Sequence, residues 1–218
     1  MSPEDFGTAI LRSRRSFLGS TLWAGATAAL VQAQPLLAGR GWLAAAHAAT
    51  PDLTHDTFNG LLAFVVPGSD PYSVAQGVST AEQGGVDAGA TDVLIATVDE
   101  STPFVPSFST QVAAILNGLA VTVNPAPGGT FLSPFARLGF AQKAGVFEIM
   151  DSTDTLQPLG GILPPFIAFF CYSEAGAFDP VTRSLTGQPL GWQLSSYQGI
   201  ADGRDEFLGY LKGSRNPK

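Results

Sequence analysis

The chain is poor in the side chains that most catalytic and cofactor sites require. Its 218 residues include one cysteine, Cys171, and two histidines, His47 and His55. A single cysteine excludes an intramolecular disulfide, and the apolar neighbours of Cys171 predict a buried, unreactive thiol. So few imidazoles argue against a histidine zinc site, a two-histidine iron site and a serine–histidine–aspartate triad. We expect His55 to be a solvated residue in the first turn of a helix.

Two cofactor fingerprints are also missing. The sequence has no Gly-x-Gly-x-x-Gly stretch for a dinucleotide and no Cys-x-x-Cys-His stretch for covalent haem. We therefore expect no cofactor in this chain. Basic residues are scarce as well, because 11 lysines and arginines stand against 18 acidic residues. An acidic chain without a basic cluster is a poor candidate for binding nucleic acid or anionic lipid.

The beginning of the chain carries the pattern of a twin-arginine export signal. No charge interrupts residues 16–39, which follow a pair of arginines. The uncharged stretch is long enough to span a membrane if it stays attached, but its many Gly, Thr and Gln residues favour a signal that is removed. The motif and the small-x-small cleavage site that follows it consist of Arg14, Arg15, Phe17 and Leu18, and of Ala46 and Ala48. We predict that residues 1–48 are a cleaved signal and that the protein is exported to the periplasm, the cell envelope or the exterior.

Residues 49–218 are long enough for one domain with a core that needs no disulfides. Apolar residues with helical spacing predict a mostly α domain with long loops. We expect Thr54 to cap the first helix and Ser133 to begin a later one, and we expect residues 73–90 to form an ordered loop. The predicted helical stretches are Pro51–Pro67, Thr110–Val123, Ser133–Asp151, Phe166–Tyr172 and a last short helix around Phe207–Leu211. Asp92–Asp99 fits a helix or helical turn, and its β-branched residues also allow a short strand.

The sequence leaves two interpretations open for each of two apolar regions. Residues 166–172 are hydrophobic on every side, which is typical of a central buried helix or of a contact with another subunit. Residues 176–218 have little periodicity and are predicted to form an extended C-terminal arm. The arm is rich in aromatic residues, which either bind a partner or pack back onto the helices: Phe178, Trp192, Tyr197, Phe207 and Tyr210.

Several short motifs together resemble the gluconate 2-dehydrogenase subunit 3 family. Besides the twin-arginine leader, the resemblance covers nearly all of residues 49–218. Its motifs are Phe64-Val65-Val66-Pro67-Gly68-Ser69-Asp70, Gly85-Val86-Asp87-Ala88-Gly89-Ala90, Phe135-Ala136-Arg137-Leu138 with Lys143 and Phe147-Glu148, Phe169-Phe170-Cys171-Tyr172-Ser173-Glu174, Gly191-Trp192 and Tyr197-Gln198-Gly199. The chain departs from commoner members in the Ser195-Ser196 run and in its acidity, which leaves the substrate of the partner open.

The resemblance implies a noncatalytic small subunit. Members of this family pair with a large flavoprotein of the glucose–methanol–choline (GMC) type, often together with a membrane cytochrome c. The large subunit can lack a signal of its own, and the small subunit then carries it through the twin-arginine translocase. The resemblance thus implies FAD in the partner and none in this chain.

Two other functions remain open on the residues alone. A stand-alone exported enzyme could use Asp202, Asp205 and Glu206 with Tyr197 and Arg204 as an acid–base cluster, although these residues also fit a solvated helix start. A carrier of a small apolar ligand could use the phenylalanines of residues 166–170, although core packing also accounts for them.

Overall fold

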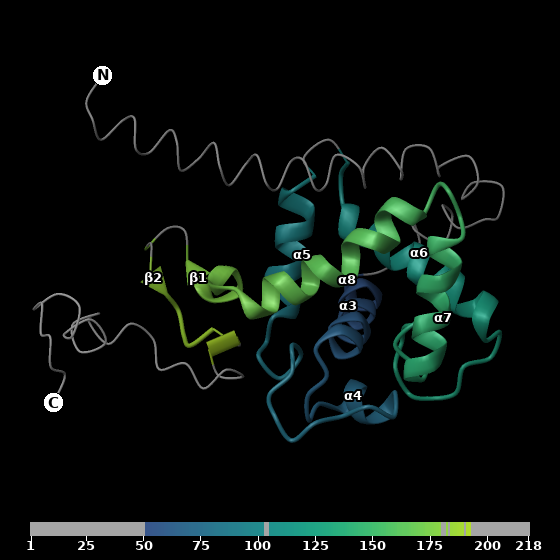
Figure 1. Cartoon of the computed structure of the whole chain (residues 1–218), viewed down its shortest axis with the longest axis horizontal. Helices are drawn as coiled ribbons and strands as arrows, with labels where there is room; N and C mark the ends of the chain where they lie inside the picture. The colour runs from purple at the N-terminus through teal and green to yellow at the C-terminus, as the bar shows by residue number, and fades with distance from the viewer. Residues whose placement is uncertain (1–50, 103–104, 180–181, 183, 190, 193–218) are drawn as a thin grey trace, which may run out of the picture.

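The computed structural model describes residues 51–102, 105–179, 182, 184–189 and 191–192. Within these residues the chain forms six α-helices and one two-stranded antiparallel hairpin, which confirms the predicted mostly helical fold (Figure 1). The elements, labelled as in Figure 1, are α3 (Pro51–Val65), α4 (Pro71–Ala75), α5 (Thr91–Glu100), α6 (Phe108–Val123), α7 (Phe140–Asp151), α8 (Gln157–Tyr172), η1 (Glu174–Ala177), β1 (Phe178–Asp179) and β2 (Ser184–Leu185). No helix among the described residues is long and apolar enough to cross a membrane.

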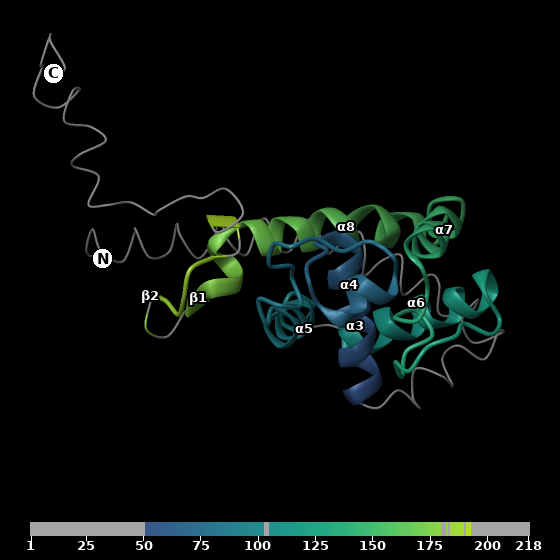
Figure 2. The same cartoon turned by 90° about the horizontal axis from the view of Figure 1, so that it is seen from below.

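Helix α3 lies at the centre and contacts α4, α5, α6 and α8. Figure 2 shows α8 along one side of the domain, running from α7 to the hairpin. The predicted apolar faces of α3 and α6 form the core between them. Their fully buried members are Phe58, Leu61 and Leu62 on α3 and Val112, Ile115, Leu116 and Leu119 on α6. Burying each such side chain contributes about 1.5–3 kcal/mol, so these two faces hold the bundle together.

The predicted loop of residues 73–90 is ordered, although its first residues belong to α4. Asp70 caps α4, because its Oδ1 accepts hydrogen bonds from the backbone N–H groups of Tyr72 and Ser73 at 2.9 and 3.0 Å. Farther on, the Asp87 carboxylate accepts from the Ser69 N–H at 2.9 Å and from the Gly84 N–H at 3.2 Å. The loop therefore folds back on the end of α3 and is held there by side-chain acceptors.

One predicted cap and two predicted helix starts were wrong. Helix α3 begins at Pro51 as predicted, so Thr54 lies inside it and not at its cap. Helix α8 begins at Gln157 and not at Phe166, with Pro164 and Pro165 inside it. Helix α7 begins at Phe140 and not at Ser133. Ser133 instead caps a separate turn, because its Oγ accepts from the Ala136 N–H at 3.1 Å, and its own N–H donates to the buried Asp56 carboxylate at 2.7 Å. This tertiary bond holds Ser133 in a turn that the local sequence does not reveal.

The first part of the predicted arm is folded. Residues Phe178 and Asp179 pair with Leu185 and Ser184, and the Thr186 N–H donates to the Ala177 carbonyl at 2.8 Å. Figure 1 shows this hairpin beyond the C-terminal end of α8. Residues 193–218 of the predicted arm lie outside the described residues.

Candidate functional site

Most of the residues that the sequence nominated for function lie outside the described residues. These are the export and cleavage residues Arg14, Arg15, Phe17, Leu18, Ala46 and Ala48, the aromatic residues Tyr197, Phe207 and Tyr210, and the charged group Asp202, Arg204, Asp205 and Glu206. Two nominated residues are described: Phe178 begins β1, and Trp192 is half-buried at the end of the described chain. The site is therefore built around α8, which ends next to them.

Helix α8 has an apolar face that points away from the core. Gly161, Pro165, Phe169 and Tyr172 follow one another at spacings of four, four and three residues, so they line one side of the helix, and all four are exposed. We call these four residues the α8 face. The side chains of Phe169 and Tyr172 are 67% and 52% exposed.

The whole of α8 contains no charged residue. An exposed helix in a globular domain ordinarily carries polar or charged side chains on its outer side, and an exposed apolar patch marks a contact site. The opposite side of α8 packs normally into the core, where Leu163, Ile167 and Phe170 are buried. One side of the apolar segment is thus buried in the core as predicted, and the other side is exposed. Because residues on both sides are apolar, the sequence contains no signal that separates them.

Two prolines alter the backbone of the α8 face. Pro164 and Pro165 lie inside the helix and have no N–H, so they cannot donate the helical hydrogen bonds that the carbonyls of Gly160 and Gly161 would ordinarily accept. Gly160 packs against Met150, where an added Cβ would lie 2.8 Å from the Met150 Cβ. Gly161, by contrast, has nothing within 4 Å of an added Cβ. The α8 face therefore combines aromatic side chains with an open stretch of backbone.

The end of the described chain returns to α8. A Cβ at Gly191 would collide with the backbone carbonyl of Tyr172, so only glycine allows this close approach. The structure thus brings Trp192, a predicted partner-binding residue, to the C-terminal end of the α8 face. A cavity of about 60 Å³ lies nearby, lined in part by Phe170, Cys171 and Gln188. It is far smaller than the 300–1,000 Å³ typical of a ligand or cofactor pocket.

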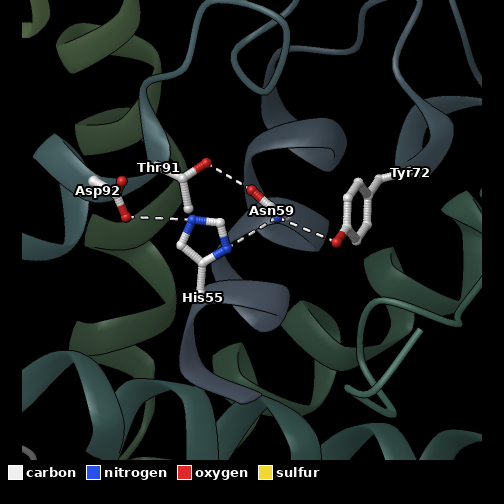
Figure 3. A network of polar contacts seen from close by, with 5 residues as sticks. All are labelled: His55, Asn59, Tyr72, Thr91 and Asp92. Carbon is white, nitrogen blue, oxygen red and sulfur yellow. Dashed lines mark hydrogen bonds and ion pairs between the residues drawn. The ribbon is translucent and has the colours of Figure 1, made fainter. Parts of the chain in front are cut away.

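A second candidate site is polar and surrounds His55, the single histidine of the described residues (Figure 3). His55 is not simply solvated as predicted, because its Nε2 lies 3.3 Å from Asp92 Oδ1 and its Nδ1 lies 3.3 Å from the Asn59 amide nitrogen. The same amide donates to the Tyr72 hydroxyl at 3.1 Å, and Thr91 Oγ1 donates to Asn59 Oδ1 at 2.6 Å. Figure 3 shows Asn59 between the imidazole and the phenol. The network joins α3 to α4 and α5.

This network has the character of a structural link. The Tyr72 hydroxyl donates to Asp56 Oδ1 at 2.6 Å, and burial together with this carboxylate raises the pKa of Tyr72 to about 12. An open cleft of about 390 Å³ beside His55 is lined by hydroxyls and by Asp52, Asp92 and Asp99. Asp99 is already engaged, since it accepts from the Ser109 N–H at 2.8 Å and from Ser109 Oγ at 3.0 Å. The Ser109 hydroxyl donates its hydrogen bond to Asp99 and not to the imidazole. It therefore lacks the adjacent general base that activates a nucleophilic serine.

A buried amine was not foreseen as a special position. Lys143, which the sequence marked only as part of a motif, is completely buried on α7. Its Nζ donates to the Gly60 carbonyl and to Gln76 Oε1, both at 2.9 Å, and lies 5.5 Å from the centre of the Phe135 ring. Burial lowers the pKa of Lys143 to about 7, against the opposing effect of the Asp70 charge. The amine ties α7 to α3 and to the end of α4.

The predicted state of Cys171 is confirmed. Its side chain is 4% exposed, and burial raises the pKa of the thiol to about 12. The thiol is therefore protonated and inaccessible, which is the opposite of what a reactive cysteine needs. Among the described residues, no group of His, Cys, Asp or Glu side chains is arranged to hold a metal ion.

Comparisons of this chain with protein-family models, with curated proteins and with solved structures found no match.

Proposed function

We propose that this protein is a noncatalytic small subunit that binds a GMC-type FAD-dependent dehydrogenase and escorts it through the twin-arginine export pathway. In this proposal residues 1–48 supply the export signal for both proteins. The FAD and the catalytic residues belong to the large subunit, and a membrane cytochrome c is a further member of the complex in the related systems.

The observation that carries the proposal is the α8 face. A domain that worked alone in water would gain solubility from charged residues on the outer side of α8, yet the helix has none. Aromatic residues such as Phe169 and Tyr172 are the side chains that contribute most to binding energy at protein interfaces. Gly191 lies against the Tyr172 backbone, so Trp192, its neighbour in the chain, follows directly after the chain returns to the end of α8.

The export signal supports the same function for an independent reason. A flavoprotein acquires its cofactor while it folds in the cytoplasm, so it must be exported folded, and the twin-arginine pathway accepts folded cargo. A partner without its own signal has to stay bound during transit. Such a complex needs a stable interface, for which roughly 2,000 Å² or more of buried surface is typical.

Co-purification from the native host tests the proposal. A tagged chain recovered after export should bring with it a larger protein that contains FAD, recognised by its flavin absorbance. Replacing Arg14 and Arg15 with lysine should leave both proteins in the cytoplasm. An exported chain that is alone and carries out a reaction unaided would refute the proposal.

Surface variants test the α8 face itself. The double variant Phe169→Ser and Tyr172→Ser should retain the fold and weaken the complex at least tenfold, since a single aromatic hot-spot residue contributes about 2 kcal/mol or more. Leu132→Ser is the matched control, because Leu132 is 59% exposed but belongs to the loop between α6 and α7. If both variants bind equally well, the α8 face is not the contact.

A further inference from the structure

We infer that the surface that covers the α8 face is apolar at its centre and carries lysine or arginine residues at its rim. This inference rests on the proposed function and specifies the chemistry of the partner. It follows from the distribution of charge around α8 and from the hydrogen-bonding groups that the face offers.

The surface of the described domain has almost no cation. The basic side chains of the described residues are Arg137 and Lys143; Lys143 is buried, and Arg137 is half-buried against the carbonyl oxygens of Phe131 and Leu132. Acidic side chains are exposed at many positions of the same surface. Whatever binds this domain therefore meets an anionic surface, and its own positive charges determine how fast it docks.

Exposed carboxylates lie close to both ends of helix α8. Asp151 and Asp154 precede the first turn of α8, and Glu174 follows its C-cap residue Ser173. The position of Asp154 has an ordinary structural explanation, because the dipole of α8 favours a negative charge near the N-terminus of the helix. Glu174 has the opposite relation to the helix: the C-terminal end of α8 is its negative end, and a carboxylate there is disfavoured. Glu174 makes no ion pair with any described residue, and its only helical compensation is that it begins the four-residue η1.

The α8 face offers acceptors to a partner and almost no donors. The Gly161 carbonyl cannot receive the helical hydrogen bond from Pro165, and the carboxylates of Glu174 and Asp154 are acceptors when ionised. The Tyr172 hydroxyl is the exception, since it can donate as well as accept. A partner surface that matches this set must bring N–H donors, and lysine and arginine supply them with a positive charge.

The same charges argue against two other occupants. A second copy docked through the α8 face would bring acidic ends against acidic ends in either orientation, because Asp154 and Glu174 are both negative. Like charges placed together across an interface cost several kcal/mol. A membrane surface with anionic headgroups would be repelled in the same way. We therefore expect the isolated chain to remain a monomer.

Charge reversal in the co-purified complex tests the inference. Glu174→Lys should slow association with the flavoprotein about tenfold at 50 mM salt, since rim charges act mainly on the association rate. The wild-type rate should fall by a similar factor between 50 and 500 mM salt, as screening shortens the range of the attraction. Asp52→Lys is the matched control, because Asp52 is exposed in the first turn of α3, the end that points away from α8 in Figure 2.

The Glu174→Lys variant separates a binding defect from a folding defect. A lysine at the C-terminal end of α8 agrees with the helix dipole, so the melting temperature of this variant should stay the same or rise while association slows. A complex whose formation depends neither on salt nor on Glu174 would overturn the inference and leave the proposed function standing. If no flavoprotein accompanies the exported chain, the proposed function fails first. Self-association of the isolated chain that Glu174→Lys abolishes or strengthens would also overturn the inference.

Discussion

The buried Lys143 amine should make the stability of the domain rise with pH above neutrality. In the unfolded chain the pKa of this amine is 10.5, and in the folded domain burial lowers the pKa to about 7. Between these two values the unfolded state binds a proton that the folded state has released. The free energy of unfolding therefore increases as the pH rises through this window.

The size of the effect follows from the two pKa values. A difference of one pH unit across such a window is worth about 1.4 kcal/mol when the folded amine is fully neutral. Because about half of the folded molecules are still protonated at pH 7, the expected gain in unfolding free energy between pH 7 and pH 9 is about 2 kcal/mol. At higher pH the gain should end, since the pKa of Cys171 is raised from 9.0 to about 12 and that of Tyr72 from 10.0 to about 12. These two groups stay protonated in the folded state, so deprotonation of the unfolded chain then lowers stability.

Urea unfolding of the exported chain at pH 7, 8, 9 and 10 measures this dependence. The variant Lys143→Met keeps an unbranched side chain that is one heavy atom shorter and has no titrating group, so its stability should not rise between pH 7 and pH 9. The denaturant dependence of the unfolding free energy should stay constant, so that differences report stability and not compactness. A wild-type chain whose stability does not rise between pH 7 and 9, or a Lys143→Met variant that rises equally, would refute the reasoning.

Three further predictions concern single side chains. Tyr72→Phe should lower the unfolding free energy by about 1–3 kcal/mol, because it removes one of the two donors to the buried Asp56 carboxylate and leaves only the Ser133 N–H. Tyr172→Phe on the exposed face should change it by less than about 0.5 kcal/mol in the same denaturation assay. Cys171 should resist a thiol reagent in the native protein and react fully in urea; rapid native labelling would contradict its burial. Gly191→Val should force the chain away from the Tyr172 carbonyl and speed the labelling of Cys171, and an unchanged labelling rate would show that this contact is unimportant.

The positions of the helices could be predicted because their information is local. Phe58, Leu61 and Leu62 repeat at helical spacing, as do the apolar residues of α6, and these positions became the core. The buried state of Cys171 was predictable for the same reason, since its neighbours in the chain are apolar. Where the start of a helix depended on a distant partner, prediction failed: Ser133 forms a turn because its N–H reaches Asp56, 77 residues earlier in the chain.

The sequence alone determined that this protein is a mostly helical domain behind a twin-arginine pattern, because periodicity and motifs depend on neighbours in the chain. Only the tertiary structure decided which side of α8 is exposed, that Lys143 is buried, and that His55 pairs with Asp92. The sequence of a helix that is apolar on every side does not indicate which side is buried, because that depends on where the other helices pack. A lysine or histidine likewise acquires its protonation and its partners only from residues that folding brings near.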